Sequence, residues 1–116
     1  MIALRADLKV VVASQPIDFR RGVHGLVALV AEAGSDPYNG DIFIFRSKRK
    51  DRLKLLAWDG SGIVLATKWL EEGGFTWPPV TGGRVEISTE QMAVLMAGLD
   101  WTRLAPGPVR RPTKVD

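Results

Sequence analysis

The sequence predicts a single α+β domain in which two amphipathic helices pack on an antiparallel β-meander sheet. Between Ile42 and Trp77, short apolar runs alternate with turn residues, and the connections are too short for the crossovers that parallel strands need. Apolar residues with helical spacing lie on both sides of this region. The chain has 116 residues, of which 46% are hydrophobic and 25% charged, as expected for one soluble globular domain.

The first third of the chain is expected to form a strand and then a helix. Residues 8–13 are rich in β-branched side chains and are soon followed by Pro16, which is typical of a strand and its end. We expect Asp18 to be the N-cap of the helix and Gly34 to provide its left-handed C-terminal cap. The apolar face of this helix follows the spacing i, i+3, i+4 and i+7 and comprises Val23, Leu26, Val27 and Val30.

The meander itself is expected to contain four strands. Its basic loop is predicted at 47–52, and the later turns at 59–62 and 71–74 are rich in glycine and acidic residues. The run 42–45 has no polar alternation, which indicates a strand covered on both faces or one at a protein contact. The expected strands are 42–46, 53–58, 63–70 and 75–77.

The last part of the chain is expected to add a short strand at 84–87 and a second helix. Ser88 and Gln91 have the spacing of a capping box at the start of that helix. Its apolar stripe comprises Met92, Leu95, Met96 and Leu99. The domain is therefore expected to span residues 1–104, and the Pro/Arg-rich residues 105–116 are expected to form a mobile tail.

The composition excludes several classes of site. Without cysteine there is no disulfide framework or thiolate metal site, and with His24 as the only histidine a His-rich metal site is excluded too. No metal and no cofactor are expected. The sequence shows neither a secretory h-region nor a run long enough to span a bilayer, so we expect a cytoplasmic location without membrane contact.

Three carboxylates occupy special positions, but their local patterns favour structural roles. Asp18 is interpreted as a helix cap, Asp59 as part of a hairpin turn and Asp100 as a residue after the second helix. The alternative is a nuclease site in which three carboxylates hold two metal ions. The three positions do not fall at matching strand ends, so we expect a protein that is not an enzyme.

The positive charge is concentrated in two short segments. The net charge is +3, yet residues 46–54 alone carry six cations and one anion, and residues 103–116 carry four cations and one anion. A basic hairpin tip can follow a phosphate backbone, because each contact releases condensed counterions. The alternative is a solvated loop that aids solubility. The candidate nucleic-acid-binding residues of this run are Arg46, Lys48, Arg49, Lys50, Arg52 and Lys54.

The four tryptophans are further candidates, because aromatic rings can stack on bases. Large aromatic side chains more often belong to the core, so we expect at most one of the four to be functional. Trp69 alternates with its neighbours as in a half-buried strand. The other three are Trp58, Trp77 and Trp101.

Five segments, taken in order, resemble a known family. They are 18–26, 36–46, 51–62, 75–78 and 98–101, and they include the runs Asp-Phe-Arg-Arg-Gly and Ala-Trp-Asp-Gly-Ser-Gly. Together they resemble the TnpB accessory proteins of the sixty-six family of insertion sequences, from about Asp7 to Arg103. The RNA-guided nucleases that share the name TnpB are unrelated, since they carry zinc motifs that a chain without cysteine lacks.

The resemblance implies a non-catalytic accessory protein for DNA transposition, encoded beside a separate transposase. The implied partners are DNA, in particular transposon ends, the cognate transposase with other proteins of the same element, and a second copy of the chain. Arg20 and Arg21 lie in a matched segment at an expected helix start, where cations oppose the helix dipole, so they join the candidate DNA contacts. The alternative function is an interaction module that docks the transposase or self-associates without touching DNA.

Overall fold

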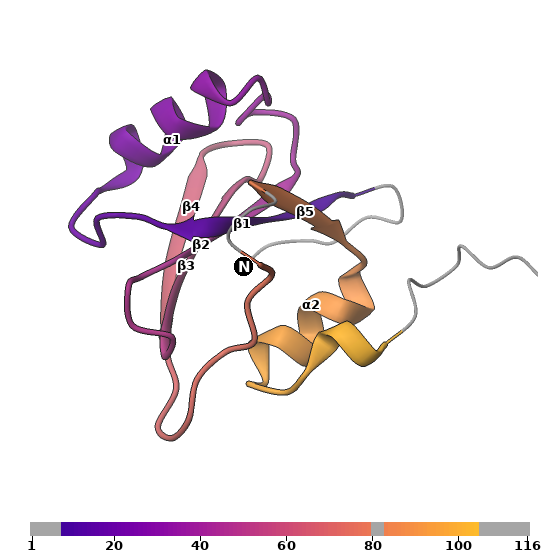
Figure 1. The fold of residues 1–116 in the computed structure, drawn as a ribbon. Coiled ribbons are helices and arrows are strands. Elements are labelled where there is room, and N and C mark those ends of the chain that lie inside the picture. The colour runs from indigo at the N-terminus through magenta and orange to yellow at the C-terminus, as the bar shows by residue number, and fades with distance from the viewer. Residues whose placement is uncertain (1–7, 80–82, 105–116) are drawn as a thin grey trace, which may run out of the picture.

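The computed structural model describes residues 8–79 and 83–104, and in them a five-stranded sheet lies between two helices (Figure 1). The α+β class is thereby confirmed. The expected tail at 105–116 lies outside the described residues. The elements are β1 (Val10–Pro16), α1 (Val23–Glu32), β2 (Ile42–Arg46), β3 (Arg52–Trp58), β4 (Ile63–Trp69), β5 (Arg84–Ile87), α2 (Thr89–Met96) and the short 3-10 helix η2 (Trp101–Arg103).

The sheet has the order β4-β3-β2-β1-β5 and is mixed rather than purely antiparallel. The pairs β2–β3 and β3–β4 are antiparallel, as the meander predicts. The expectation of an antiparallel sheet is wrong for β1, which pairs parallel to β2 with Val10 opposite Ile42. The reason is the connection, because α1 carries the chain back along the sheet before β2 begins.

The strand expected at 75–77 does not form, and this prediction is wrong. The Phe75 side chain is buried in the core, and its backbone N–H donates to the carbonyl of Lys50 at 2.8 Å. This burial and this backbone hydrogen bond hold the segment in place without the repeated backbone hydrogen bonds of a strand pair. Two consecutive prolines, Pro78 and Pro79, follow it.

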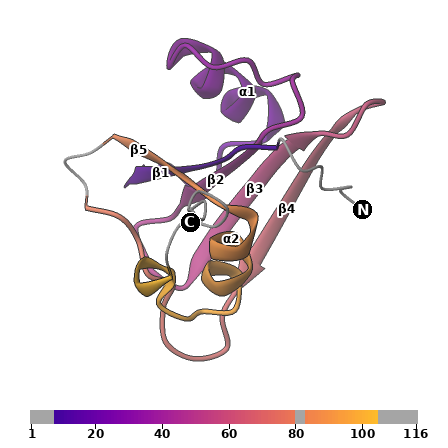
Figure 2. The ribbon, with the colours of Figure 1, turned by 90° about the vertical axis from the view of Figure 1, so that its right-hand side faces the viewer.

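The two helices cover opposite faces of the sheet (Figure 2). Neighbouring residues of a strand point to opposite faces, so β2 supplies both layers and all five of its residues are buried. Its apolar run is thus covered on both faces, the first of the two interpretations above. The α1 layer contains Leu26, Val30, Phe43, Phe45 and Leu56. The α2 layer includes Val10, Val12, Ile42, Ile44, Leu53, Leu55, Phe75, Leu95 and Trp101.

Two of the three helix ends for which the sequence predicts a cap agree with the structure. Gly34 has a φ of 87° after α1, and Ser88 and Gln91 form the capping box of α2 through bonds of 3.0 and 2.9 Å. Asp18 is not the N-cap of α1, because Gly22 holds that position. The Asp18 carboxylate instead accepts hydrogen bonds from Arg20.

The apolar stripe of α2 also departs from its expected length. Leu95 is fully buried, and Met92 and Met96 pack against the core. The helix ends at Met96, so Leu99 lies beyond it and its side chain is 62% exposed. Gly98 causes this early end, since its φ of 79° reverses the chain after the last helical turn.

Candidate nucleic-acid interface

The parallel pairing of β1 and β2 places the ends of both strands at one edge of the sheet. Pro16 lies opposite Arg46, and the Ile17 N–H donates to the Arg46 carbonyl at 2.9 Å. The segment after β1, residues 17–22, therefore leaves the sheet beside the segment after β2, residues 47–51. We call these the β1 loop and the basic loop. Such edges, at the carboxyl ends of parallel strands, are common binding sites in α/β proteins.

A groove of about 420 Å³ lies between the two loops, and four of the eight predicted binding residues line it. These are Arg20 from the β1 loop and Lys48, Arg49 and Arg52 from the basic loop and the start of β3. The first three are exposed and Arg52 is half-buried. We call this the basic groove; its remaining lining is Pro16, Ile17, Asp18, Phe19 and Ser47.

Two carboxylates lie among these cations: Asp51, whose Oδ1 is 3.7 Å from the Arg52 Nε, and Asp18, which pairs with Arg20. The Arg20 Nη2 is 2.8 Å from Asp18 Oδ2, and the Arg20 Nε and backbone N–H donate to Asp18 Oδ1 at 3.0 Å. These hydrogen bonds from Arg20 hold the pKa of Asp18 well below its usual range. The Arg20 side chain nevertheless remains 90% exposed. Its guanidinium is therefore held at the groove and still faces solvent.

The Lys54 side chain holds the β1 loop in place. Its ammonium donates to the carbonyls of Phe19 at 2.7 Å and Arg21 at 2.9 Å, and it lies 4.7 Å from the centre of the Phe19 ring. The ammonium is thus already engaged within the protein. Arg21 is exposed but lies outside the groove lining, and its guanidinium donates to the Gly25 carbonyl at 3.4 Å.

Arg46 and Lys50 are also placed away from the groove. Arg46 points to the α2 face of the sheet, where it is only 8% exposed and its guanidinium carbon lies 5.6 Å from the centre of the Trp77 ring. The Lys50 side chain is exposed, but it is not part of the lining. Its carbonyl accepts hydrogen bonds from the Phe75 N–H and Trp77 Nε1.

The basic loop is fixed by the segment that follows β4. The Leu70 N–H donates to the Asp51 carbonyl at 2.9 Å, and the Phe75 N–H donates to the Lys50 carbonyl at 2.8 Å. Gly74 packs so closely on the Lys50 side chain that a Cβ atom there would lie 2.9 Å from the Lys50 Cβ. The loop therefore has defined backbone partners even though its three consecutive cations are exposed.

A second hollow, of about 410 Å³, lies next to the basic groove on the side of the edge strand β4. It is lined by Phe19, Lys54, Thr67 and Trp69, and Phe19 lines both hollows. The expectation of a half-buried Trp69 is wrong, because its side chain is 64% exposed. Trp69 belongs to the edge strand β4 and lies opposite Arg52, whose guanidinium carbon is 5.2 Å from its ring centre.

The other special carboxylates have local structural roles. Asp59 accepts hydrogen bonds from the backbone of Ser61 and Gly62 at 2.9 Å, which closes the β3–β4 turn. Asp100 caps η2 by accepting from the Thr102 hydroxyl at 2.5 Å and from the Thr102 backbone N–H at 3.0 Å. These bonds lower the pKa of both carboxyl groups. Among residues 8–79 and 83–104, no cluster of three or more His, Asp or Glu residues is placed to hold a metal ion.

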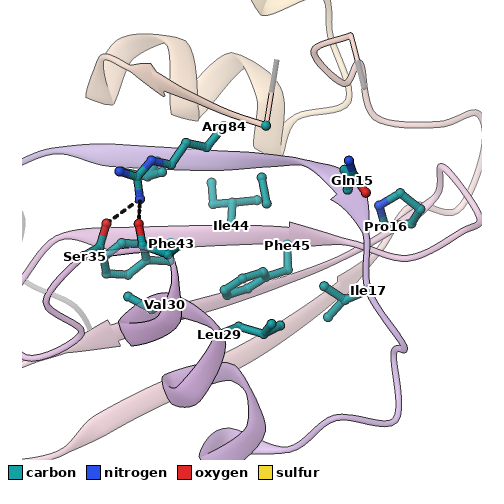
Figure 3. Close-up of a pocket in the computed structure, with 14 residues that line it drawn as sticks. Gln15, Pro16, Ile17, Leu29, Val30, Ser35, Phe43, Ile44, Phe45 and Arg84 are labelled. Atoms are coloured by element: carbon teal, nitrogen blue, oxygen red, sulfur yellow. Dashed lines mark hydrogen bonds between the residues drawn. The ribbon is translucent and has the colours of Figure 1, made fainter. Parts of the chain in front are cut away.

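A cavity of about 590 Å³ with a mainly apolar lining lies between α1 and the β1–β2 part of the sheet (Figure 3), and we call it the apolar groove. Leu29, Phe43 and Phe45 face it, and Arg84 lies at its rim. The Arg84 guanidinium donates to the Ser35 hydroxyl at 2.6 Å and to the Ala33 carbonyl at 3.3 Å. This apolar groove lacks the convergent cations of the basic groove, so it offers a surface for apolar groups rather than for phosphates.

Comparisons with known proteins agree with the sequence motifs. A family model described as IS66 Orf2 like protein matches residues 8–106. The chain is 58% identical over 116 residues to the uncharacterized protein y4jC of Sinorhizobium fredii and 36% identical to the uncharacterized protein y4hO of the same organism, with 99% of each chain covered. No solved structure gives a significant match.

Within the described part of the chain, no helix has both the length and the apolar character needed to cross a membrane. The resemblance found in the sequence is confirmed by the family model, which covers the sheet, both helices and the basic groove. The chain belongs to the IS66 Orf2 like family, the TnpB proteins associated with transposition of insertion sequences.

Proposed function

We propose that this protein is a non-catalytic accessory factor in DNA transposition and that it binds DNA through the basic groove. Membership of the IS66 Orf2 like family supports the link to transposition. The observation that carries DNA binding is the convergence of Arg20 with Lys48, Arg49 and Arg52 around one groove. A basic loop that only aided solubility would not need a further cation, such as Arg20, placed beside it by a separate loop.

The charge pattern suits a phosphate backbone. Residues 46–54 carry six cations and Asp51, and Arg20 adds a further exposed cation from the β1 loop. Contacts from the exposed cations among them to phosphates would release condensed counterions and provide most of the affinity. Because phosphate contacts position a protein without reading bases, binding through the groove should depend weakly on sequence.

A salt series on one triple variant tests the proposal. Changing Lys48, Arg49 and Lys50 together to Ala should flatten the slope of log K against log salt by up to about 3 units, since each phosphate contact contributes roughly 0.9 on duplex DNA. Transposon-end and random duplexes should be affected alike. All three side chains are exposed, so the melting temperature should hardly change. An unchanged slope in a folded variant would remove the basic loop from the DNA interface.

The apolar groove favours a second function, docking of the transposase. Ala33 is exposed and lines this groove, so Ala33→Arg places a bulky side chain there without removing a core residue. If the protein is mainly an interaction module, Ala33→Arg weakens capture of the cognate transposase. In that case Ala33→Arg and the triple variant of Lys48, Arg49 and Lys50 both keep the wild-type DNA affinity. If our proposal holds, the triple variant loses DNA affinity while Ala33→Arg retains it.

A further inference from the structure

We propose that Trp69, together with Arg52, forms a stacking platform for an unpaired base, so that the protein binds single-stranded or frayed DNA. This inference rests on the proposed function, because it assumes that the DNA backbone lies in the basic groove. It adds the form of DNA that is preferred.

The first observation is that Trp69 is the most exposed of the four tryptophans. Its side chain is 64% exposed, while Trp101 is 6% exposed and bonds through Nε1 to the Thr76 carbonyl. Trp58 and Trp77 are half-buried and contact other aromatic rings. A single exposed apolar residue is common on protein surfaces, so exposure alone does not identify a site.

The second observation is the chemistry around the Trp69 ring. On the α1 face of the sheet, β3 and β4 pair Arg52 with Trp69 and Lys54 with Thr67. Residues nearer the β3–β4 turn on this face are covered by α1, but these two pairs lie beyond the apolar layer. The Arg52 guanidinium lies over one face of the Trp69 ring, with its carbon 5.2 Å from the ring centre, which orients the ring.

The third observation is the continuity of the two hollows. Phe19 lines both the basic groove and the hollow beside Trp69. A DNA strand whose phosphates contact Arg20, Lys48 and Arg49 therefore passes two aromatic rings, those of Phe19 and Trp69. A positively charged groove interleaved with exposed aromatic rings is the usual arrangement of single-strand binding sites.

The exposed ring distinguishes between the forms of DNA. In a duplex, the faces of the bases are covered by their neighbours, so Trp69 cannot stack on them unless a base is unpaired or flipped out. A duplex uses only the phosphate contacts of the basic groove. Trp69 should therefore contribute to the affinity for single strands and contribute little to the affinity for duplexes.

The experiment compares wild type, Trp69→Ala and Trp69→Phe in binding to a thymidine oligonucleotide and to a random duplex. We expect Trp69→Ala to bind the single strand about ten-fold more weakly, since stacking on one aromatic ring contributes roughly 1–3 kcal/mol per base. Trp69→Phe should retain most of this affinity. Duplex affinity should stay within about two-fold for both variants, and tryptophan fluorescence quenching by the single strand should be lost in both.

The outcomes separate this inference from the function on which it rests. If Trp69→Ala binds both forms of DNA like wild type, the stacking platform is wrong and the basic groove stands. If wild type binds neither form, the proposed function fails first. If Trp69→Ala loses transposase capture but keeps its single-strand affinity, Trp69 is an anchor for a protein and the inference is overturned.

Discussion

At the scale of single residues, neighbouring cations of one basic run have different roles. Arg46 and Lys54 lie at the two ends of the run, and both are used inside the protein, one against Trp77 and the other under the β1 loop. The difference follows from the alternation of side chains along a strand, which turns Arg46 toward the α2 face. The exposed Lys48 and Arg49 of the loop remain available for an anionic partner.

The variant Asp18→Asn tests how the Asp18 carboxylate affects DNA binding by the basic groove. Asp18→Asn removes the carboxylate beside Arg20 but keeps an oxygen that can accept from the Arg20 backbone N–H. We expect tighter DNA binding with a nearly unchanged salt slope, because the variant removes a negative charge beside the phosphate that Arg20 contacts but adds no new phosphate contact. Asp36→Asn is the matched control: Asp36 is exposed, its Oδ1 accepts from the Tyr38 N–H, and it lies near the opposite end of the sheet.

The pH dependence of this effect follows from the pKa of Asp18. The hydrogen bonds from Arg20 lower that pKa in the folded protein, so the carboxylate stays charged from neutral pH down through the usual range of aspartate. Its stabilising contribution is present above the unfolded-state pKa and is lost only as the pH falls toward the folded value. The affinity gain of Asp18→Asn should therefore be the same at about pH 4, where an ordinary aspartate is half protonated, as at pH 7. A gain that is halved at pH 4 would contradict the strong pairing.

At the scale of elements, the sequence predicts local structure well and pairing less well. The bounds of β2, the capping box at Ser88 and the glycine at the end of α1 follow from spacing and turn chemistry, which act within a few residues. The parallel pairing of β1 depends on the path of α1, which local patterns do not encode. The order strand, helix, strand was the available signal for this crossover. Trp69 is exposed because it lies beyond the apolar layer that α1 covers.

The segment after β4 is expected to control the position of the basic loop. Gly74→Ala places a methyl group 2.9 Å from the Lys50 Cβ and 3.4 Å from the Lys50 carbonyl oxygen, so the loop must shift. We expect a loss of about 1 kcal/mol in the free energy of unfolding, near the lower limit for overpacking because the contact is at the surface. DNA affinity should fall as well. Gly62→Ala is the control, since a Cβ there would meet nothing within 4 Å.

Two measurements decide this prediction. Thermal melting reports the stability of each glycine variant, and DNA titration reports the position of the loop. If Gly74→Ala and Gly62→Ala have the same melting temperature and the same DNA affinity, the contact between Gly74 and Lys50 does not position the basic loop.

At the scale of the whole molecule, the fold separates charge along the sheet. The basic loop and Arg20 lie at the edge where β1 and β2 end, whereas Asp41 and the Asp59 turn lie where β2 begins and β3 ends. Such a distribution orients a protein on a polyanion, with its basic edge toward the phosphates. The sequence predicts all four cations that line the basic groove but assigns its carboxylate, Asp18, to a helix cap. The convergence of Arg20 with the other three cations arises only from the parallel pairing of β1 and β2.

Two separate loops together form the proposed DNA-binding groove, and three matched single variants test this arrangement. Arg20→Gln, Lys48→Gln and Lys9→Gln each remove one exposed cation; Lys9 precedes β1 and lies at the opposite end of the sheet, where its backbone N–H donates to Asp41. In a salt series with duplex DNA, the first two should each flatten the slope by about 0.9, and Lys9→Gln should leave it unchanged. Equal slopes for all three variants, or a change for Lys48 without one for Arg20, would contradict this arrangement.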